Sequence, residues 1–168
     1  MTDAVIRAAT PDDVHVWRAL RLDGIQRHPQ AFIVTDKEAA AVSVDEDAAR
    51  LSKGDRFLAF RDGVAVGLIG LNRQSMPRMA HRGEIGPLYV APDARGQGIA
   101  DGLLGAVVAA AQGFGVWQLE LSVYVENPVA IALYERHGFT LTGKIPNAIA
   151  GVDGFEDDLL MVRILDRA

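Results

Sequence analysis

The chain has 168 residues, of which 49% are hydrophobic and 23% charged, a balance typical of one globular domain rather than of a disordered chain. Its 22 acidic and 17 basic residues give a formal net charge of −5, which argues against general nucleic-acid binding because phosphate neutralisation needs a concentrated basic surface. The absence of cysteine excludes disulfides, thiolate zinc sites and an acyl-cysteine intermediate.

Neither the first residues nor the longest apolar stretch of the sequence predicts membrane insertion. It begins MTDAVIRAATPDD, which has an early acidic residue and no apolar run of signal-peptide length. The longest apolar stretch, residues 103–111, is too short to cross a bilayer. We therefore expect a cytoplasmic protein without a membrane partner, folded as a single domain over residues 1–168.

In the N-terminal half the pattern predicts a strand at 5–8, a helix at 10–27, a loop or broken helix at 31–42, a helix at 43–53 and strands at 56–61 and 64–71. Thr10 and Pro11 form a favourable helix start. Ser43, with Glu46 three residues later, forms a capping box. Asp62-Gly63 is a strong hairpin signal between the two strands that flank it.

In the C-terminal half the pattern predicts strands at 81–91 and 117–125, helices at 98–113 and 128–137, and closing strands at 140–145 and 159–165. The run from 81 to 125 is a strand–helix–strand crossover, whereas other strands are joined by hairpins. The predicted fold is thus α/β (α+β), with a single mixed, mostly antiparallel twisted sheet of six to seven strands and helices on both faces.

A glycine-rich turn, Arg95-Gly96-Gln97-Gly98-Ile99-Ala100, leads from the fourth strand into a helix. Such a turn exposes successive main-chain N–H groups, and the helix dipole adds positive potential, so the turn suits a pyrophosphate. The two glycines let phosphate oxygens approach without a Cβ in the way. No Lys-Ser/Thr pair follows, which excludes a Walker A site. A glycine turn without a ligand remains an alternative.

A dinucleotide site is a second alternative for this turn. The fingerprint G-x-G-x-x-G nearly fits, but Asp101 stands in the third glycine position and Gly102 comes one residue late. Glu120, about twenty residues after the turn, would be the acid that binds the ribose. A nicotinamide or flavin dinucleotide binder therefore stays open.

Arg95-x-x-Gly98-x-Ala100 resembles the acyl-CoA signature (Gln/Arg)-x-x-Gly-x-(Gly/Ala) of the GNAT superfamily of acetyltransferases. Residues 127–139 are similar to that family's N-x-x-A-x-x-x-Y-x-x-x-G-F segment. The two motifs come in the family's order and, with a suitable N-terminal half, cover most of the chain. The resemblance implies direct acetyl transfer from acetyl-CoA to a primary amine in a ternary complex, with a small-molecule amine favoured over a protein amine.

The resemblance also implies a sheet splayed between strands four and five, with the pantetheine arm between them. Gly86-Pro87 lies inside the fourth strand, and a proline there predicts a bulge because it lacks an N–H, although an edge-strand proline is the alternative. We expect the freed main chain of Leu88, Tyr89 and Val90 to pair with pantetheine. The Val90 N–H would polarise the thioester carbonyl.

The other cofactor contacts follow from the same resemblance. The main chain of the turn would cradle the pyrophosphate through Arg95, Gly96, Gln97, Gly98, Ile99 and Ala100, and the Arg95 side chain would add charge at the rim. Asn127 would hold the CoA arm or a water, unless it only caps the helix that Pro128 begins.

Two residues are expected to move protons. Tyr134, two helical turns after Asn127, would protonate the departing CoA thiolate, or it would be an aromatic packing residue. Glu84 resembles the family's glutamate that acts as a base through water, or it would pair with Arg82. His81 is the reserve base.

Several features carry less information. The four histidines have no metal-ligand spacing, so we expect no metal. The acidic segment 153–158 is expected to be a solvated loop or to line the acceptor entrance. A non-catalytic acyl-CoA sensor or interaction domain on the same fold is the alternative function. Similar proteins are often homodimers. Residues 22–34 and 145–155, which would contact the acceptor, carry no diagnostic chemistry.

Overall fold

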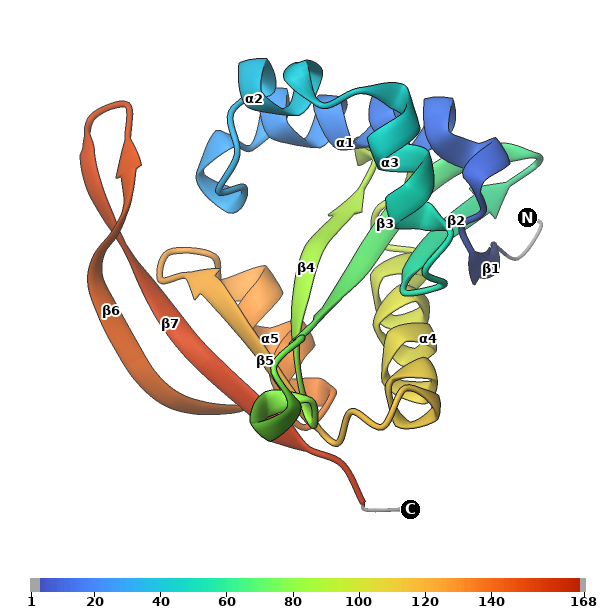
Figure 1. The fold of residues 1–168 in the computed structure, drawn as a ribbon. Coiled ribbons are helices and arrows are strands. Elements are labelled where there is room, and N and C mark those ends of the chain that lie inside the picture. Colours follow the sequence, from blue (N-terminus) through green and yellow to red (C-terminus); the bar gives the residue numbers. More distant parts are fainter. Residues whose placement is uncertain (1–3, 167–168) are drawn as a thin grey trace.

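The structure, a computed structural model, describes residues 4–166 and contains one seven-stranded sheet in the order β1-β2-β3-β4-β5-β7-β6 (Figure 1). The strands are β1 (Val5–Ala8), β2 (Arg56–Arg61), β3 (Val64–Arg73), β4 (Arg82–Val90), β5 (Gln118–Tyr124), β6 (Thr140–Gly151) and β7 (Gly154–Ile164). Within residues 4–166 every strand pair is antiparallel except β4 with β5. The predicted mixed, mostly antiparallel sheet is confirmed; the ends of the predicted domain, residues 1–3 and 167–168, lie outside the described residues.

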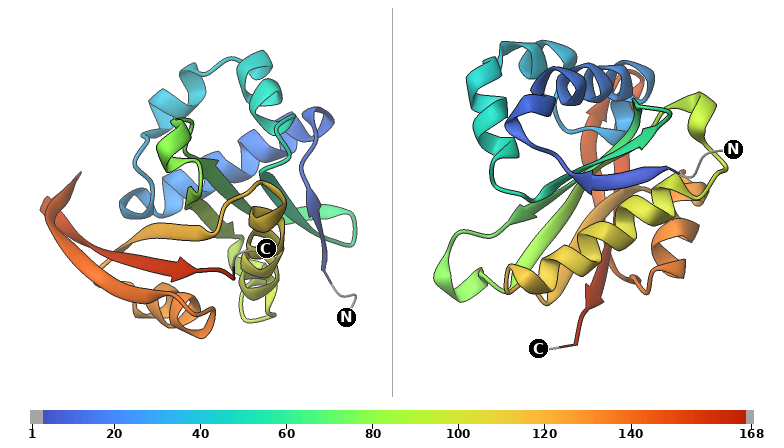
Figure 2. Two further views of the ribbon diagram at one scale, coloured as in Figure 1. Left: turned by 60° about the horizontal axis from the view of Figure 1, so that its bottom comes forward. Right: turned by 90° about the vertical axis from the view of Figure 1, so that its right-hand side faces the viewer.

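Helices cover both faces of the sheet, as predicted (Figure 2). They are α1 (Val14–Arg27), α2 (Asp36–Ala41), α3 (Val44–Leu51), α4 (Ile99–Gly113) and α5 (Pro128–Arg136). One buried cluster joins the sheet to α4 and α5, with Leu103, Val107 and Leu133 among its members. A second joins the other face to α1 and α3 through Trp17 and Leu51. No helix formed by residues 4–166 combines the length and the apolar composition needed to cross a bilayer.

Local sequence signals explain most helix starts. The Ser43 hydroxyl accepts the Glu46 N–H at 3.2 Å, and the Glu46 carboxylate accepts the Ser43 N–H at 3.1 Å, which is the predicted capping box of α3. The expected helix at 10–27 begins later, because residues 11–13 form a 3₁₀ turn. That turn is fixed by Asp13, whose carboxylate accepts the Thr10 N–H at 2.8 Å.

The sheet opens between β4 and β5. These strands pair at only three positions, from Arg82–Gln118 to Glu84–Glu120, whereas β5 stays paired with β7 along its whole length. Figure 1 shows β4 and β5 diverging beyond that point. The Gly86-Pro87 peptide is cis, and the β3–β4 register shifts opposite it, between Ile69 and Leu71. The predicted splay and the predicted bulge are both confirmed.

The closing strands differ from the prediction. Instead of short strands at 140–145 and 159–165, β6 and β7 form a long hairpin that projects from the sheet (Figure 1). Residues 156–158 therefore belong to β7 and are not a solvated loop: the Asp157 carboxylate pairs with Lys144 at 2.7 Å, and Asp158 is buried. The register of β6 is interrupted between Ile145 and Ile149, which hides the strand pattern in the sequence.

Candidate active site

The turn after β4 presents main-chain donors at the start of α4. Gly96 and Gly98 have φ of 71° and 75°, a left-handed backbone that glycine adopts without steric cost. Gly98 is the N-cap of α4, and no side chain caps the helix. The amide N–H groups of Ile99, Ala100 and Asp101 therefore lack intrahelical acceptors. Free main-chain donors at a helix start are a geometry that can bind an anion, and the assignment of this turn to a pyrophosphate stays a prediction.

The side chains of this turn point elsewhere. The Gln97 side-chain oxygen accepts a hydrogen bond from Arg61 at 2.8 Å. The Arg95 Nε donates to the Val90 carbonyl at 3.0 Å, and its Nη2 lies 2.8 Å from His28 Nε2. Arg95 thus folds back against β4 and α1, in contrast to the predicted charge at the rim of the turn. The side chain of Gln97 is therefore held by Arg61 and does not extend freely from the turn.

The open edge of β4 carries main-chain groups of alternating direction. The Ala91 N–H donates to the Val66 carbonyl of β3 at 2.8 Å. Because alternate residues of an antiparallel strand direct their polar groups to opposite edges, the main chain of Tyr89 also faces β3, whereas that of Leu88 and Val90 faces the gap. The bond from Arg95 to the Val90 carbonyl lies on that same side.

Tyr89 contributes its side chain to the other layer of the protein. Its ring is 4% exposed and its hydroxyl donates to the Asp23 carboxylate at 2.5 Å. The contact joins β4 to α1 beside the open edge of the sheet. Of the three residues predicted to pair with pantetheine, Leu88 and Val90 are therefore the two with main-chain groups directed into the gap.

The two predicted residues of α5 lie on the α4 side of the sheet. The Asn127 side-chain oxygen accepts the Ala130 N–H at 3.1 Å, so Asn127 caps α5. Tyr134 packs edge-on against Phe139 with ring centroids 5.8 Å apart. Its hydroxyl has no hydrogen-bond partner within residues 4–166, and burial raises the pKa of Tyr134 to about 12. Tyr134 and Val90 belong to the same buried cluster.

Glu84 lies at the closed end of the splay, in register with Glu120. Arg82 pairs with Glu120 at 2.5 and 2.7 Å and not with Glu84. Hydrogen bonding from Arg82 lowers the pKa of the Glu120 carboxyl. Gly83 and Ile85 face the cluster under α4, so Glu84 faces the α1 side. In the part of the chain that the structure describes, the Glu84 carboxylate has no ion pair or hydrogen bond.

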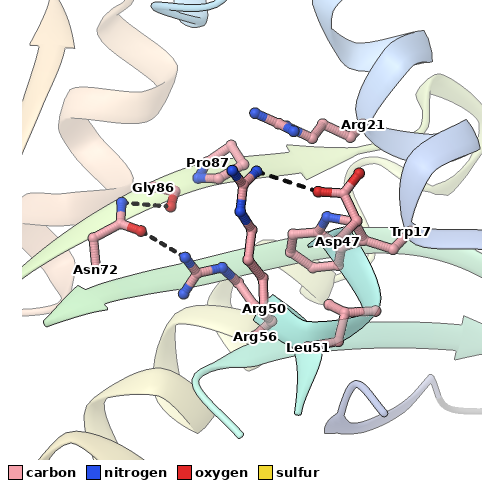
Figure 3. A pocket seen from close by; sticks show the side chains of 9 residues that line it. All are labelled: Trp17, Arg21, Asp47, Arg50, Leu51, Arg56, Asn72, Gly86 and Pro87. Carbon is pink, nitrogen blue, oxygen red and sulfur yellow. Dashed lines mark hydrogen bonds and ion pairs between the residues drawn. The ribbon is translucent and has the colours of Figure 1, made fainter. Parts of the chain in front are cut away.

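A cavity of about 250 Å³ lies on the α1 side of the sheet (Figure 3). It is lined by Trp17, Arg21, Asp47, Arg50, Leu51, Arg56, Asn72, Gly86 and Pro87. None of its polar side chains was predicted from the sequence to be functional. These polar side chains come from α1, α3, β2 and β3, and a local sequence motif therefore cannot predict the cavity.

The geometry disfavours a dinucleotide site. Glu120 lies in register with Glu84, which is six residues, or about 20 Å of strand, before the end of β4 at Val90. The glycine turn follows only after that end of the strand. Gly102 serves the packing of α4 on β1, because a Cβ there would stand 2.5 Å from Ile6 Cδ1. The glycines and the acid of the supposed fingerprint therefore do not form one binding site.

Residues 20–139 match the Acetyltransferase (GNAT) family. The chain is 35% identical over 105 residues to N-alpha-acetyltransferase MAK3 of Arabidopsis thaliana, which covers 62% of this chain and 55% of the relative. It is 28% identical over 134 residues to mycothiol acetyltransferase of Brachybacterium faecium, which covers 79% of this chain and 39% of the relative. The chain thus spans about half, or less, of the length of these curated relatives.

Solved structures share the fold. A GNAT-family acetyltransferase from Streptococcus pneumoniae superposes with a TM-score of 0.85 at 24% identity, covering 98% of this chain and 100% of that one. A phosphinothricin acetyltransferase from Sinorhizobium meliloti, determined in complex with acetyl-CoA, gives a TM-score of 0.81 at 23% identity, covering 98% and 89%. The family match over residues 20–139 accounts for both the glycine turn and the splayed sheet. The chain belongs to the acetyltransferase (GNAT) family.

Proposed function

We propose that the protein transfers an acetyl group from acetyl-CoA directly to a primary amine, with a small-molecule amine as the acceptor. The observation that carries this proposal is the uncapped start of α4 beside the gap between β4 and β5. The N–H groups of the turn would bind the diphosphate, and the thioester arm would lie along Leu88 and Val90. The cavity of about 250 Å³ lies on the α1 side of the sheet, opposite the face that α4 covers, and its size favours a small acceptor.

The relatives acetylate both kinds of acceptor, judged by their names. They include an N-alpha-acetyltransferase and, at 30% identity over 89 residues, an L-amino acid N-acetyltransferase of Escherichia coli, which covers 52% of this chain and 54% of the relative. The choice between protein and small-molecule amines for this chain therefore rests on its own acceptor face.

The proposed reaction uses the two faces of the sheet separately. On the α1 side, Glu84 takes a proton from the ammonium through water, and the free amine attacks the thioester carbon. A C–N bond forms, and the Val90 N–H stabilises the negative charge on the carbonyl oxygen. The C–S bond then breaks, and Tyr134 on the α4 side gives its proton to the thiolate. The nitrogen, positively charged after the attack, loses its second proton to water, and water gives a proton back to Tyr134. Glu84 releases the proton that it accepted to solvent, and the acetylated amine and CoA leave.

Replacing Gly98 by Ala tests the cradle. A Cβ at Gly98 meets no protein atom within 4 Å, so the folded protein accommodates it, but it would stand in the path of a diphosphate. We expect Gly98→Ala to weaken acetyl-CoA binding about tenfold or more, measured by isothermal titration calorimetry. The left-handed φ should also lower the free energy of unfolding by about 1 kcal/mol.

Gly115→Ala is the matched control, because Gly115 has φ of 74°, equally open surroundings and a position past the far end of α4. It should show the same loss of stability with unchanged acetyl-CoA affinity. If Gly98→Ala and Gly115→Ala bind acetyl-CoA with equal affinity, the turn is not part of the cofactor site. Tight acetyl-CoA binding without acetyl transfer to any amine or peptide would instead indicate the sensor function.

A further inference from the structure

The cavity on the α1 side has an excess of positive charge in a protein that is acidic overall. Three arginines line it, Arg21 from α1, Arg50 from α3 and Arg56 from β2, against one carboxylate, that of Asp47 (Figure 3). The chain as a whole has a formal net charge of −5. The local excess of cations therefore runs against the overall composition and needs a specific explanation.

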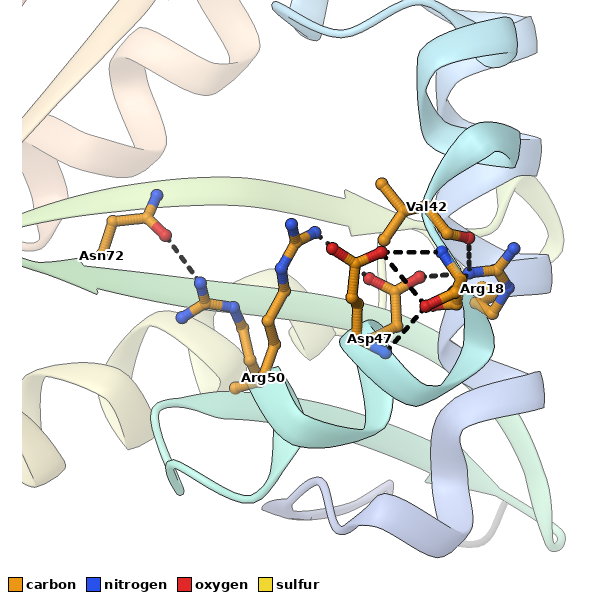
Figure 4. Close-up of polar contacts among 8 residues, drawn as sticks. Arg18, Val42, Asp47, Arg50 and Asn72 are labelled. Carbon is orange, nitrogen blue, oxygen red and sulfur yellow. Dashed lines mark hydrogen bonds and ion pairs between the residues drawn. The ribbon is translucent and has the colours of Figure 1, made fainter.

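The one carboxylate in the cavity is already used. Asp47, whose side chain is 4% exposed, accepts a hydrogen bond from Arg18 and another from Arg50 at 3.3 Å (Figure 4). Arg18 also donates to the Val42 carbonyl at 2.8 Å. Asp47 thus holds α1 and α3 together, and its charge is shared by two arginines.

Arg56 is also satisfied by its surroundings. It donates to the Asp55 carboxylate at 2.9 Å, to the Leu71 carbonyl at 2.6 Å and to the Asn72 side-chain oxygen at 2.6 Å. The Asn72 amide in turn donates to the Gly86 carbonyl at 3.3 Å. Arg56 therefore fixes the floor of the cavity next to the bulge in β4.

Arg21 is different, because it has no hydrogen bond or ion pair to any other residue between 4 and 166. Its side chain is half-buried against the cavity (Figure 3). Burial lowers the pKa of the Arg21 guanidinium, Asp47 opposes that shift, and the positive charges of Arg50 and Arg18 add to it. A guanidinium in such a place is stabilised by an anion that enters the cavity.

The cavity ends where the chemistry is proposed to occur. Gly86 and Pro87 line it and lie at the mouth of the gap between β4 and β5. Glu84, the proposed base, is two residues from Gly86, about 7 Å along the strand. An amine beside Glu84 that carries an anionic group a few bonds away would place that group in the cavity.

We propose that the acceptor is a small primary amine bearing a carboxylate, that is, an amino acid, and that Arg21 binds the carboxylate. This inference rests on the proposed acetyl transfer and specifies its substrate class. The planar guanidinium of Arg21 can hold a carboxylate through two parallel hydrogen bonds. Trp17 and Leu51 supply apolar walls for the carbon skeleton. The N-terminus of a protein chain has an amide in place of the free α-carboxylate and would not satisfy Arg21.

The test compares glycine and the L-amino acids that have a primary amine with their carboxamides as acceptors, with CoA release as the readout. For the accepted side chains we expect kcat/KM to be about 10- to 100-fold higher with the acid than with the amide. Arg21→Leu should abolish that preference by raising the KM of the acid, with kcat and the Kd of acetyl-CoA within about threefold. Arg21→Lys, which keeps the charge but loses the two-pronged geometry, should retain part of the preference.

Arg78→Leu is the control variant, since it removes the same charge from an exposed arginine between β3 and β4 and should leave the preference intact. Unfolding temperature and acetyl-CoA affinity show that each variant is folded. The inference would be overturned if the protein accepted amides as well as acids, or if Arg21→Leu kept the preference for acids. Either result would leave the proposed acetyl transfer intact.

Calorimetric titration of the same acids and amides into the CoA-saturated protein separates the two proposals. Carboxylate-dependent binding that disappears in Arg21→Leu, without turnover, would support the anion site and count against the transferase function. If the protein shows no turnover and no carboxylate-dependent binding, the assignment of Arg21 is overturned.

Discussion

Replacing Tyr134 by Phe should lower kcat about 100-fold and leave the Kd of acetyl-CoA within about threefold, because only the proton donor is lost. Burial raises the pKa of Tyr134 to about 12, so the phenol keeps its proton across the working pH range. The thiolate of CoA is the conjugate base of a thiol with a pKa of about 8.5, so the transfer depends on proximity and orientation. Steady-state kinetics and calorimetry measure both quantities.

The same variant has a structural control built in. The Tyr134 hydroxyl has no partner within residues 4–166, and Phe keeps the edge-on contact with Phe139. Removing a hydroxyl that has no protein partner should leave the unfolding temperature nearly unchanged. A folded Tyr134→Phe protein with wild-type kcat would show that the ring only packs, and the proton would have to come from elsewhere.

Replacing Glu84 by Gln should lower kcat/KM for the acceptor about 100-fold at pH 7, because the ammonium must then lose its proton to solvent. The deficit should shrink as pH rises and the free amine becomes abundant in solution. A loss of the same size at every pH would indicate a structural role. The measurement is kcat/KM for the acceptor against pH, for the wild type and for the variant.

Glu135→Gln provides the charge-matched control for Glu84→Gln. Glu135 is exposed on α5, on the opposite face of the sheet, and its removal should change neither kcat nor its pH dependence. A second comparison is Glu120→Gln, which frees Arg82 beside Glu84. This variant should disturb the closed end of the splay and lower the free energy of unfolding, because Arg82 would lose the carboxylate to which it donates two hydrogen bonds.

Local signals predicted the elements that local chemistry determines. The capping box of Ser43 and Glu46 defines the start of α3, and Asp62-Gly63 forms the turn between β2 and β3 with positive φ at both residues. Pro87, which cannot donate to a sheet ladder, indicated the bulge in β4. The glycine turn was readable because Gly96 and Gly98 are needed at left-handed positions.

Features that depend on several distant segments were not readable. The cavity draws arginines from α1, α3 and β2, and each one alone is an ordinary surface arginine in the sequence. The orientation of Arg95 depends on His28 and on the Val90 carbonyl, one remote in sequence and the other five residues away across the turn. The full β6–β7 hairpin was missed because Pro146 and Asn147 interrupt the alternation that marks a strand.

A crystal structure with acetyl-CoA tests the central claim most directly. We expect diphosphate oxygens to accept hydrogen bonds from main-chain N–H groups between Gly96 and Ala100, and the thioester arm to run beside Leu88 and Val90. Strand β5 should remain unpaired from β4 beyond Glu84. Nucleotide bound anywhere else, with β5 hydrogen-bonded to β4 as far as Val90, would contradict the proposed enzyme site.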